Sequence, residues 1–165
     1  MALKITKVDV WAGNLRDIPG GLAEKLEALS AAGSSLQFLI ARRDDKQTGM
    51  GKVFVTPVTA RQAKDAAGRA GLQHATNIGT LRVEGADQRG LGAKMTRAMA
   101  DAGVNVRGVS AAVIGRQFVA YFGFDSDADA DAAATALKRI STAKAKKRPA
   151  KKRSATRTTR RRRAA

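Results

Sequence analysis

Two loops of the sequence place an aspartate and a glycine directly before a helical segment. The first loop consists of Asp17, Ile18, Pro19, Gly20 and Gly21, and the second of Asp87, Gln88, Arg89, Gly90 and Leu91. A glycine allows a ligand to approach the backbone closely, and the free N–H groups of a first helical turn attract carboxylates. The chemistry that both loops could perform is therefore the binding of a small anion.

Each candidate residue also has a simpler interpretation. A glycine before a helix can serve the turn alone, and Asp17 and Asp87 can cap their helices by accepting backbone N–H bonds. Asn105 lies just past the second helical segment, where asparagine is common for backbone reasons. Its side chain also offers donors and an acceptor, which suits an ammonium or a carboxylate group. The residues themselves leave both interpretations open.

The two loops belong to a repeated segment. Aspartate, glycine and a closing Ala-Gly recur at an offset of seventy residues without a gap, at positions 17/87, 20/90, 32/102 and 33/103. Recurrence of a loop and helix at a fixed period indicates two copies of one small structural unit.

The elements around each loop follow the same order in both halves. In the first half, alternation and helical spacing predict a strand at 4–11, a helix at 22–32, strands at 36–41 and 52–58, a helix from Thr59 to 70 and a strand at 72–78. In the second half they predict a strand at 80–85, a helix at 91–102, strands at 104–114 and 118–124, and a helix at 126–140.

This order is that of the ferredoxin-like split βαβ unit, whose antiparallel sheet carries both helices on one face. We therefore expect an α+β fold of two such βαββαβ modules, with their sheets joined edge to edge or back to back, which would hide exposed edges and enlarge the buried area. The expected domains are 1–78, 79–140, and a basic segment at 141–165 that is disordered in isolation because it cannot bury enough surface to fold by itself.

The repeated segment resembles the first half of an ACT domain, a regulatory βαββαβ module found across amino-acid metabolism. The resemblance rests on Asp-x-Pro-Gly-x-Leu-Ala at 17–23, on a second copy from Asp87, and on the Ala-Gly-Val-Asn ending at 102–105. It covers residues 4–140, and the spacing resembles that of small proteins with two ACT domains in tandem and no catalytic domain.

The resemblance implies a small ligand, often an amino acid, held between adjacent modules by the loop before the first helix. It assigns that role to the two loops named above, with Asn105 reaching from the next strand. Two positions depart from the pattern: Ser35 replaces asparagine in the first copy, and Arg89 replaces proline in the second. We expect the second copy, with Gly90 and Asn105, to be the functional one.

Other sites are disfavoured. Asp125, Asp127, Asp129 and Asp131 resemble a calcium loop, but alanine stands at the sixth and twelfth places where the EF-hand requires Gly and Glu. Acidic residues at a helix start complement the helix dipole, which explains the run. His74 has no evident orienting partner, and the chain has no Cys. We expect no enzyme activity, no cofactor and no metal.

Charge divides the chain unevenly. Residues 1–140 carry a net charge of +5, whereas 141–165 carry twelve basic residues and no acid. These are Lys144, Lys146, Lys147, Arg148, Lys151, Lys152, Arg153, Arg157, Arg160, Arg161, Arg162 and Arg163. The segment can bind a polyanion, nucleic acid in preference to lipid, or serve only for solubility.

The function that the sequence favours is amino-acid binding by a regulatory protein, with the basic segment tethering it to nucleic acid. The alternative is an architectural nucleic-acid-binding protein whose repeats serve only for dimerisation. Because no run of about 20 apolar residues is present, we expect a cytoplasmic protein, with nucleoid association through the basic segment. We also expect a homodimer.

Overall fold

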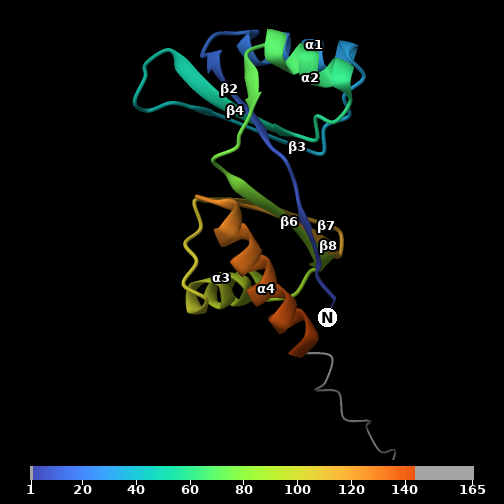
Figure 1. Cartoon of the computed structure of the whole chain (residues 1–165), viewed down its shortest axis with the longest axis vertical. Helices are drawn as coiled ribbons and strands as arrows, with labels where there is room; N and C mark the ends of the chain where they lie inside the picture. Colours follow the sequence, from blue (N-terminus) through green and yellow to red (C-terminus); the bar gives the residue numbers. More distant parts are fainter. Residues whose placement is uncertain (1, 144–165) are drawn as a thin grey trace, which may run out of the picture.

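The computed structural model describes residues 2–143. These residues form two units stacked along the long axis of the molecule, each a sheet with two helices on one face (Figure 1). The basic residues at 144–163 lie outside the described part of the chain. Within 2–143, no helix is long and apolar enough to cross a lipid bilayer.

The first unit is a four-stranded antiparallel sheet with strand order β3-β4-β2-β5. Its elements are β2 (Trp11–Arg16), α1 (Gly21–Ala31), β3 (Phe38–Arg43), β4 (Met50–Thr56), α2 (Arg61–Arg69) and β5 (Leu72–His74). The buried side chains of this unit lie between the sheet and the helices, with Leu29 of α1 against Val53 and Val55 of β4.

The second unit repeats this arrangement with strand order β1-β6-β8-β7. Its elements are β6 (Gly79–Ala86), α3 (Leu91–Asp101), β7 (Gly108–Ile114), β8 (Gln117–Phe124) and α4 (Asp127–Ala143), together with β1 (Lys4–Lys7). The expected α+β fold of two ferredoxin-like modules is therefore confirmed.

The strand predicted at 4–11 is wrong, because the structure divides it between the two units. Residues 4–7 form β1, which pairs antiparallel with β6, with Ile5 opposite Val83. Only Trp11 onward belongs to the first sheet. In the second unit β1 takes the place that β5 takes in the first, at the edge next to the strand that precedes the glycine loop. A boundary at residue 78 thus leaves one strand of the second sheet in the first half of the sequence.

The core of the second unit follows the predicted alternation. Phe118, Ala120, Phe122 and Phe124 of β8 are buried, and Leu81 and Val83 of β6 lie on the same face. Helical spacing buries Met95 and Met99 of α3 against them. Alternate side chains of a strand point to opposite faces, so one apolar set is enough to fix which face the helices cover.

Some predicted local features differ in the structure. The helix predicted from Thr59 begins only at Arg61, and its N-cap Ala60 makes no side-chain capping bond. The strand predicted at 104–114 begins only at Gly108, and the one at 72–78 ends at His74. The alternation of apolar residues does not determine where a strand begins or ends, because these bounds depend on hydrogen bonding with the neighbouring strand.

Two extended segments connect the units and run side by side (Figure 1). The amide of Val8 donates to the carbonyl of Thr80 at 3.0 Å, and the amide of Ala75 donates to the carbonyl of Val10 at 2.9 Å. The chain therefore leaves the second unit through β1 and returns to it through β6. The first unit is inserted between two neighbouring strands of the second.

Candidate functional site

In the second loop, Asp87–Leu91, the glycine directly before the helix is in the left-handed conformation. Gly90 is the N-cap of α3 and is left-handed, with φ of 75°. A Cβ added at Gly90 would meet no atom within 4 Å, so the residue is glycine because of its backbone angle and the loop is open on that side. The amide of Leu91 donates to the carbonyl of Gln88 at 3.0 Å and closes the turn.

The first turn of α3 presents backbone N–H groups at this loop. Helix geometry gives the amides of Gly92 and Ala93 no acceptor within the helix, and Gly90 makes no side-chain cap. Free N–H groups at a helix start, together with the helix dipole, favour a negatively charged group such as a carboxylate.

The loop forms one end of a groove of about 480 Å³ between α3 and β7. All five predicted loop residues line it, namely Asp87, Gln88, Arg89, Gly90 and Leu91. The walls are mainly apolar side chains of α3, β7 and β8, among them Met95, Val109, Val113, Phe118 and Phe122. Charged groups stand at one end, on Asp87 and Arg89, and apolar surface makes up the rest.

The groove exists because β7 extends beyond the helices. Val109 and Val113 are on the core-facing side of β7, opposite Phe122 and Phe118 of β8. They are nevertheless 51% and 56% exposed, since the helices of this unit pack over β1, β6 and β8 instead.

The first glycine loop has the same backbone but different surroundings. Gly20 is the left-handed N-cap of α1, with φ of 89°. Asp17, however, is held by Arg43 of β3, whose Nε lies 2.8 Å from its carboxylate, and Ile18 is 48% exposed. Pro19 and Gly21 complete this loop, and Gly21 donates its amide to the carbonyl of Ile18 at 3.1 Å.

The interpretation that Asp17 and Asp87 cap the N-termini of α1 and α3 with their side chains is wrong. The N-caps of α1 and α3 are the glycines, and neither helix has a side-chain capping bond at its N-cap. The backbone amides of Asp17 and Asp87 instead donate to carbonyls of the neighbouring hairpin turns, at Gly49 and Arg116, both at 2.9 Å. The aspartates therefore fasten each loop to the sheet through their backbones.

Asn105 is not brought to the glycine loop within one molecule. It is exposed and lies between the end of α3 and β7, whereas Gly90 precedes α3. A helix of eleven residues is about 16 Å long, so the two residues are at opposite ends of it.

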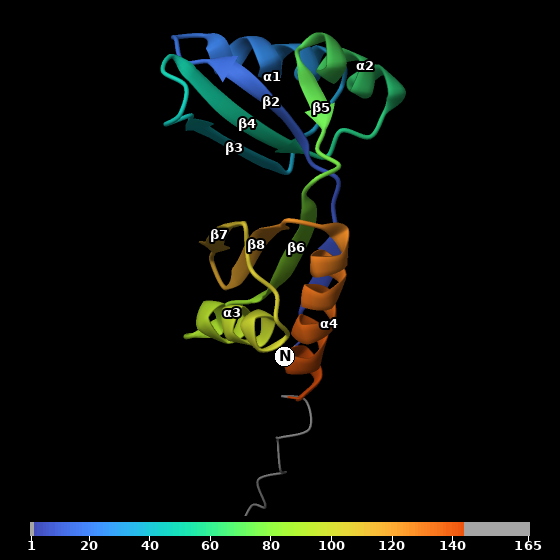
Figure 2. The same cartoon turned by 60° about the vertical axis from the view of Figure 1, so that its left-hand side comes forward.

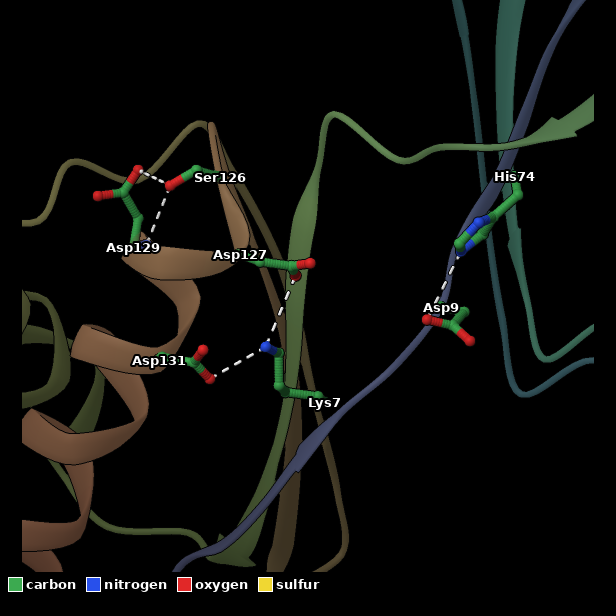
Figure 3. A network of polar contacts seen from close by, with 7 residues as sticks. All are labelled: Lys7, Asp9, His74, Ser126, Asp127, Asp129 and Asp131. Atoms are coloured by element: carbon green, nitrogen blue, oxygen red, sulfur yellow. Dashed lines mark hydrogen bonds and ion pairs between the residues drawn. The ribbon is translucent and has the colours of Figure 1, made fainter.

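The acidic residues at the start of α4 make hydrogen bonds at the helix N-terminus and ion pairs with β1 (Figure 3). Ser126 accepts a hydrogen bond from the amide of Asp129 at 3.1 Å and donates its hydroxyl to the Asp129 carboxylate at 2.7 Å. Lys7 of β1 lies 3.0 Å from Asp131 and 3.7 Å from Asp127. The hydrogen bond to Asp131 raises the pKa of Lys7 above its ordinary value.

His74 has a partner that the sequence did not reveal. Its Nε2 lies 3.5 Å from the carboxylate of Asp9 in the adjacent connecting segment (Figure 3). The two residues are sixty-five positions apart and meet because β5 pairs with β2. Within residues 2–143, no group of three or more His, Asp or Glu side chains is arranged to hold a metal ion.

Tyr121 of β8 lies at the contact between the two units. The Tyr121 ring of β8 stacks on Phe38 of β3, with centroids 4.2 Å apart. Its hydroxyl lies 3.4 Å from the carbonyl of Gln37, whose side chain accepts a hydrogen bond from Arg82 of β6. Arg82 also donates to Glu84 at 2.7 Å.

This contact gives a measurable pH dependence. Burial raises the pKa of the Tyr121 phenol above its ordinary value; Arg82 lowers it and Glu84 raises it. The unfolded chain releases this proton at lower pH than the folded chain, so stability falls as the pH rises above the ordinary phenol pKa. Tyr121 is the chain's one tyrosine. Phenolate absorbance should titrate at higher pH in the native protein than in Phe38→Ala, which exposes the ring. Equal midpoints would contradict the stacked contact.

No protein-family profile and no curated protein sequence matches the chain. Solved structures of other proteins do match the fold of this chain. The ligand-free regulatory subunit of aspartate kinase from Thermus thermophilus superposes with a TM-score of 0.58 at 20% identity, over 84% of this chain and 94% of that one. The chain has the fold of an aspartate kinase regulatory subunit.

Two further solved structures have a similar fold. A protein from Bacteroides thetaiotaomicron gives a TM-score of 0.68 at 14% identity, over 82% of this chain and 90% of that one. The aspartate kinase from Clostridium acetobutylicum gives 0.57 at 12% identity, over 86% of this chain but only 34% of the enzyme.

Proposed function

We propose that the chain is a non-catalytic regulatory protein that binds an amino acid with an apolar side chain at the loop Asp87–Leu91. The observation that carries the proposal is the groove that this loop closes at one end. The amides of α3 and Arg89 suit the ligand's carboxylate, Asp87 suits its ammonium group, and the valines of β7 suit its side chain. A structural neighbour of similar fold is the regulatory subunit of an aspartate kinase.

A thermal-shift screen of the full chain against the twenty amino acids tests the proposal. A ligand at a hundred times its Kd adds about 2.7 kcal/mol to the free energy of unfolding, which raises Tm by roughly 5–10 °C for a chain of this size. We expect such a shift with one or a few apolar amino acids and none with lysine or glutamate. Absence of any shift across the set would contradict the proposal.

We further propose that two copies associate through β7. This strand is hydrogen-bonded to β8 on one side and is the last strand of its sheet on the other. Ile114 is 75% exposed at its end, so the edge is both unpaired and apolar, which favours pairing with another chain. Val113→Lys should weaken the dimer at least tenfold in sedimentation equilibrium, whereas Thr6→Lys on the opposite edge should not. A monomeric native chain would overturn the proposal.

The basic segment supports a second activity, binding of nucleic acid without sequence preference. If about half of the twelve cations contact phosphates, log K against log salt should fall with a slope of about −5. Truncation after residue 143 keeps the hydrogen bond from the Leu3 amide to Ser141 and should abolish the binding. Unchanged binding by the truncated chain would overturn the proposal. An architectural protein, by contrast, would bind nucleic acid and respond to no amino acid.

A further inference from the structure

A cleft separates the two units on the side away from their helices. The outer faces of the two sheets are in contact around Tyr121, and β3 faces the second unit (Figure 2). Beside this contact lie two hollows, of about 250 Å³ and about 580 Å³. Both are lined by Phe54, Ile78 and Arg107, so they adjoin along these residues. The groove at Gly90 is a different hollow, although Val109 of β7 lines both it and the smaller hollow of the cleft.

The smaller hollow, of about 250 Å³ (the inner hollow), is lined by aromatic and aliphatic side chains. Phe38, Phe54 and Tyr121 line it, which are three of the chain's seven aromatic residues. Ile40 lies opposite Phe54 on neighbouring strands of the outer sheet face. Phe38, Ile40 and Phe54 remain partly exposed, so apolar surface is available to a flat hydrophobic group.

The charged side chains that line the two hollows are all basic. Arg42, Lys52 and Arg107 line the two hollows, and no aspartate or glutamate does. Arg42 and Lys52 lie directly opposite each other on β3 and β4. Like charges in this position destabilise a sheet unless an anion binds near both of them. Concentrated positive charge in a concave surface attracts anions.

The acids near these cations neutralise them only weakly. Lys52 lies 3.7 Å from Asp44, and Arg107 lies 3.4 Å from Asp125. Both cations are exposed, and so is Asp125, whereas Asp44 is 17% exposed. Ion pairs with an exposed cation contribute little and can give way to a better-placed anion. Of residues 2–143, none forms an ion pair with Arg42.

We propose that this cleft binds an aromatic carboxylate. The ring lies in the inner hollow among Phe38, Phe54 and Tyr121, and the carboxylate is held by Lys52 and Arg107 at the junction of the hollows. The proposal is independent of the amino-acid site at Gly90. Because Lys52 belongs to the first unit and Arg107 to the second, a ligand held by both fixes the angle between the units.

The experiment is a titration of the full ¹⁵N-labelled chain, followed by amide chemical shifts, with phenylacetate, phenylacetamide and acetate. We expect saturable shifts at Phe54, Ile78 and Arg107 with phenylacetate, and at least tenfold weaker binding of the other two, which lack the charge or the ring. Shifts confined to residues 87–93 would overturn this proposal while supporting the Gly90 site. No saturable shift, or equal binding of the amide, would also overturn it.

Variants separate a binding role from a structural one. Lys52→Met and Arg107→Met should each weaken phenylacetate binding about tenfold, since each removes a charged hydrogen bond. Lys64→Met, on an exposed face of α2, is the matched control and should leave it unchanged. Asp125→Asn frees Arg107 and should strengthen binding about twofold. If Asp125→Asn weakened binding as Arg107→Met does, Arg107 would serve only the structure.

Discussion

Gly90→Val should abolish the rise in Tm that an apolar amino acid gives to the native chain. The left-handed φ of 75° is strained for a β-branched residue, so the loop must change its path at the start of α3. The amides of Gly92 and Ala93 then no longer face the groove in the arrangement that the carboxylate requires. The strain should also lower the free energy of unfolding by about 1–3 kcal/mol. Both quantities come from thermal melts with and without the ligand.

The repeat supplies a control for the strain itself. Gly20 is the N-cap of α1 with φ of 89°, and a Cβ there also meets nothing within 4 Å. Gly20→Val should therefore lower stability by a similar amount and leave the ligand-induced shift intact. Loss of the shift in Gly20→Val but not in Gly90→Val would place the site in the first unit and contradict our assignment.

Ile5→Asp should unfold the second unit in preference to the first, although residue 5 is far from the second unit in sequence. Ile5 packs against the core of the second unit and lies opposite Val83. Full burial of an isoleucine contributes about 1.5–3 kcal/mol, of which the partly buried Ile5 loses a share, and a carboxylate placed against the core adds a desolvation cost. We expect a total loss of about 3 kcal/mol or more. Hydrogen exchange should show lost protection in β6 and β8 while β2 and β4 stay protected.

Thr6→Asp is the matched control, since Thr6 is exposed on the opposite face of the same strand. It should change the free energy of unfolding by no more than about 0.5 kcal/mol. Equal loss of protection in both units of Ile5→Asp would show that the units unfold together. Loss in the first unit alone would contradict the pairing of β1 with β6.

The sequence predicted the repeated fold because its signals are local. Left-handed glycines at 20, 33, 90 and 103 mark the helix ends in both copies, and all four have positive φ. The alternation of Phe118, Ala120, Phe122 and Phe124 placed β8 and its buried face. Each of these features depends on residues within a few positions of one another.

The position of β1 could not be predicted in this way, because pairing is a long-range property. Lys4 to Trp11 reads as one strand, and nothing within it shows that Ile5 and Trp11 lie in different sheets. The partner of His74 and the stack of Phe38 on Tyr121 were missed for the same reason, since their residues are sixty-five and eighty-three positions apart.

The binding role of the candidate site residues stays a prediction, whereas the structure shows how those residues are arranged. The five residues from Asp87 to Leu91 do line one groove, as their place before a helix suggested. The apolar wall from β7 was not predicted, because Val109 and Val113 read as ordinary core residues of a strand. Asn105 was assigned to the site from the resemblance to ACT domains, and the length of α3 keeps it away from Gly90 within one chain.

Amide chemical shifts of the full chain during a titration with the best amino acid of the thermal screen test the central claim most directly. We predict saturable shifts at Gly90, Leu91, Gly92 and Met95, and small changes at the corresponding Gly20 and Gly21. Shifts elsewhere with a silent Gly90 loop would contradict the claim that this loop is the binding site.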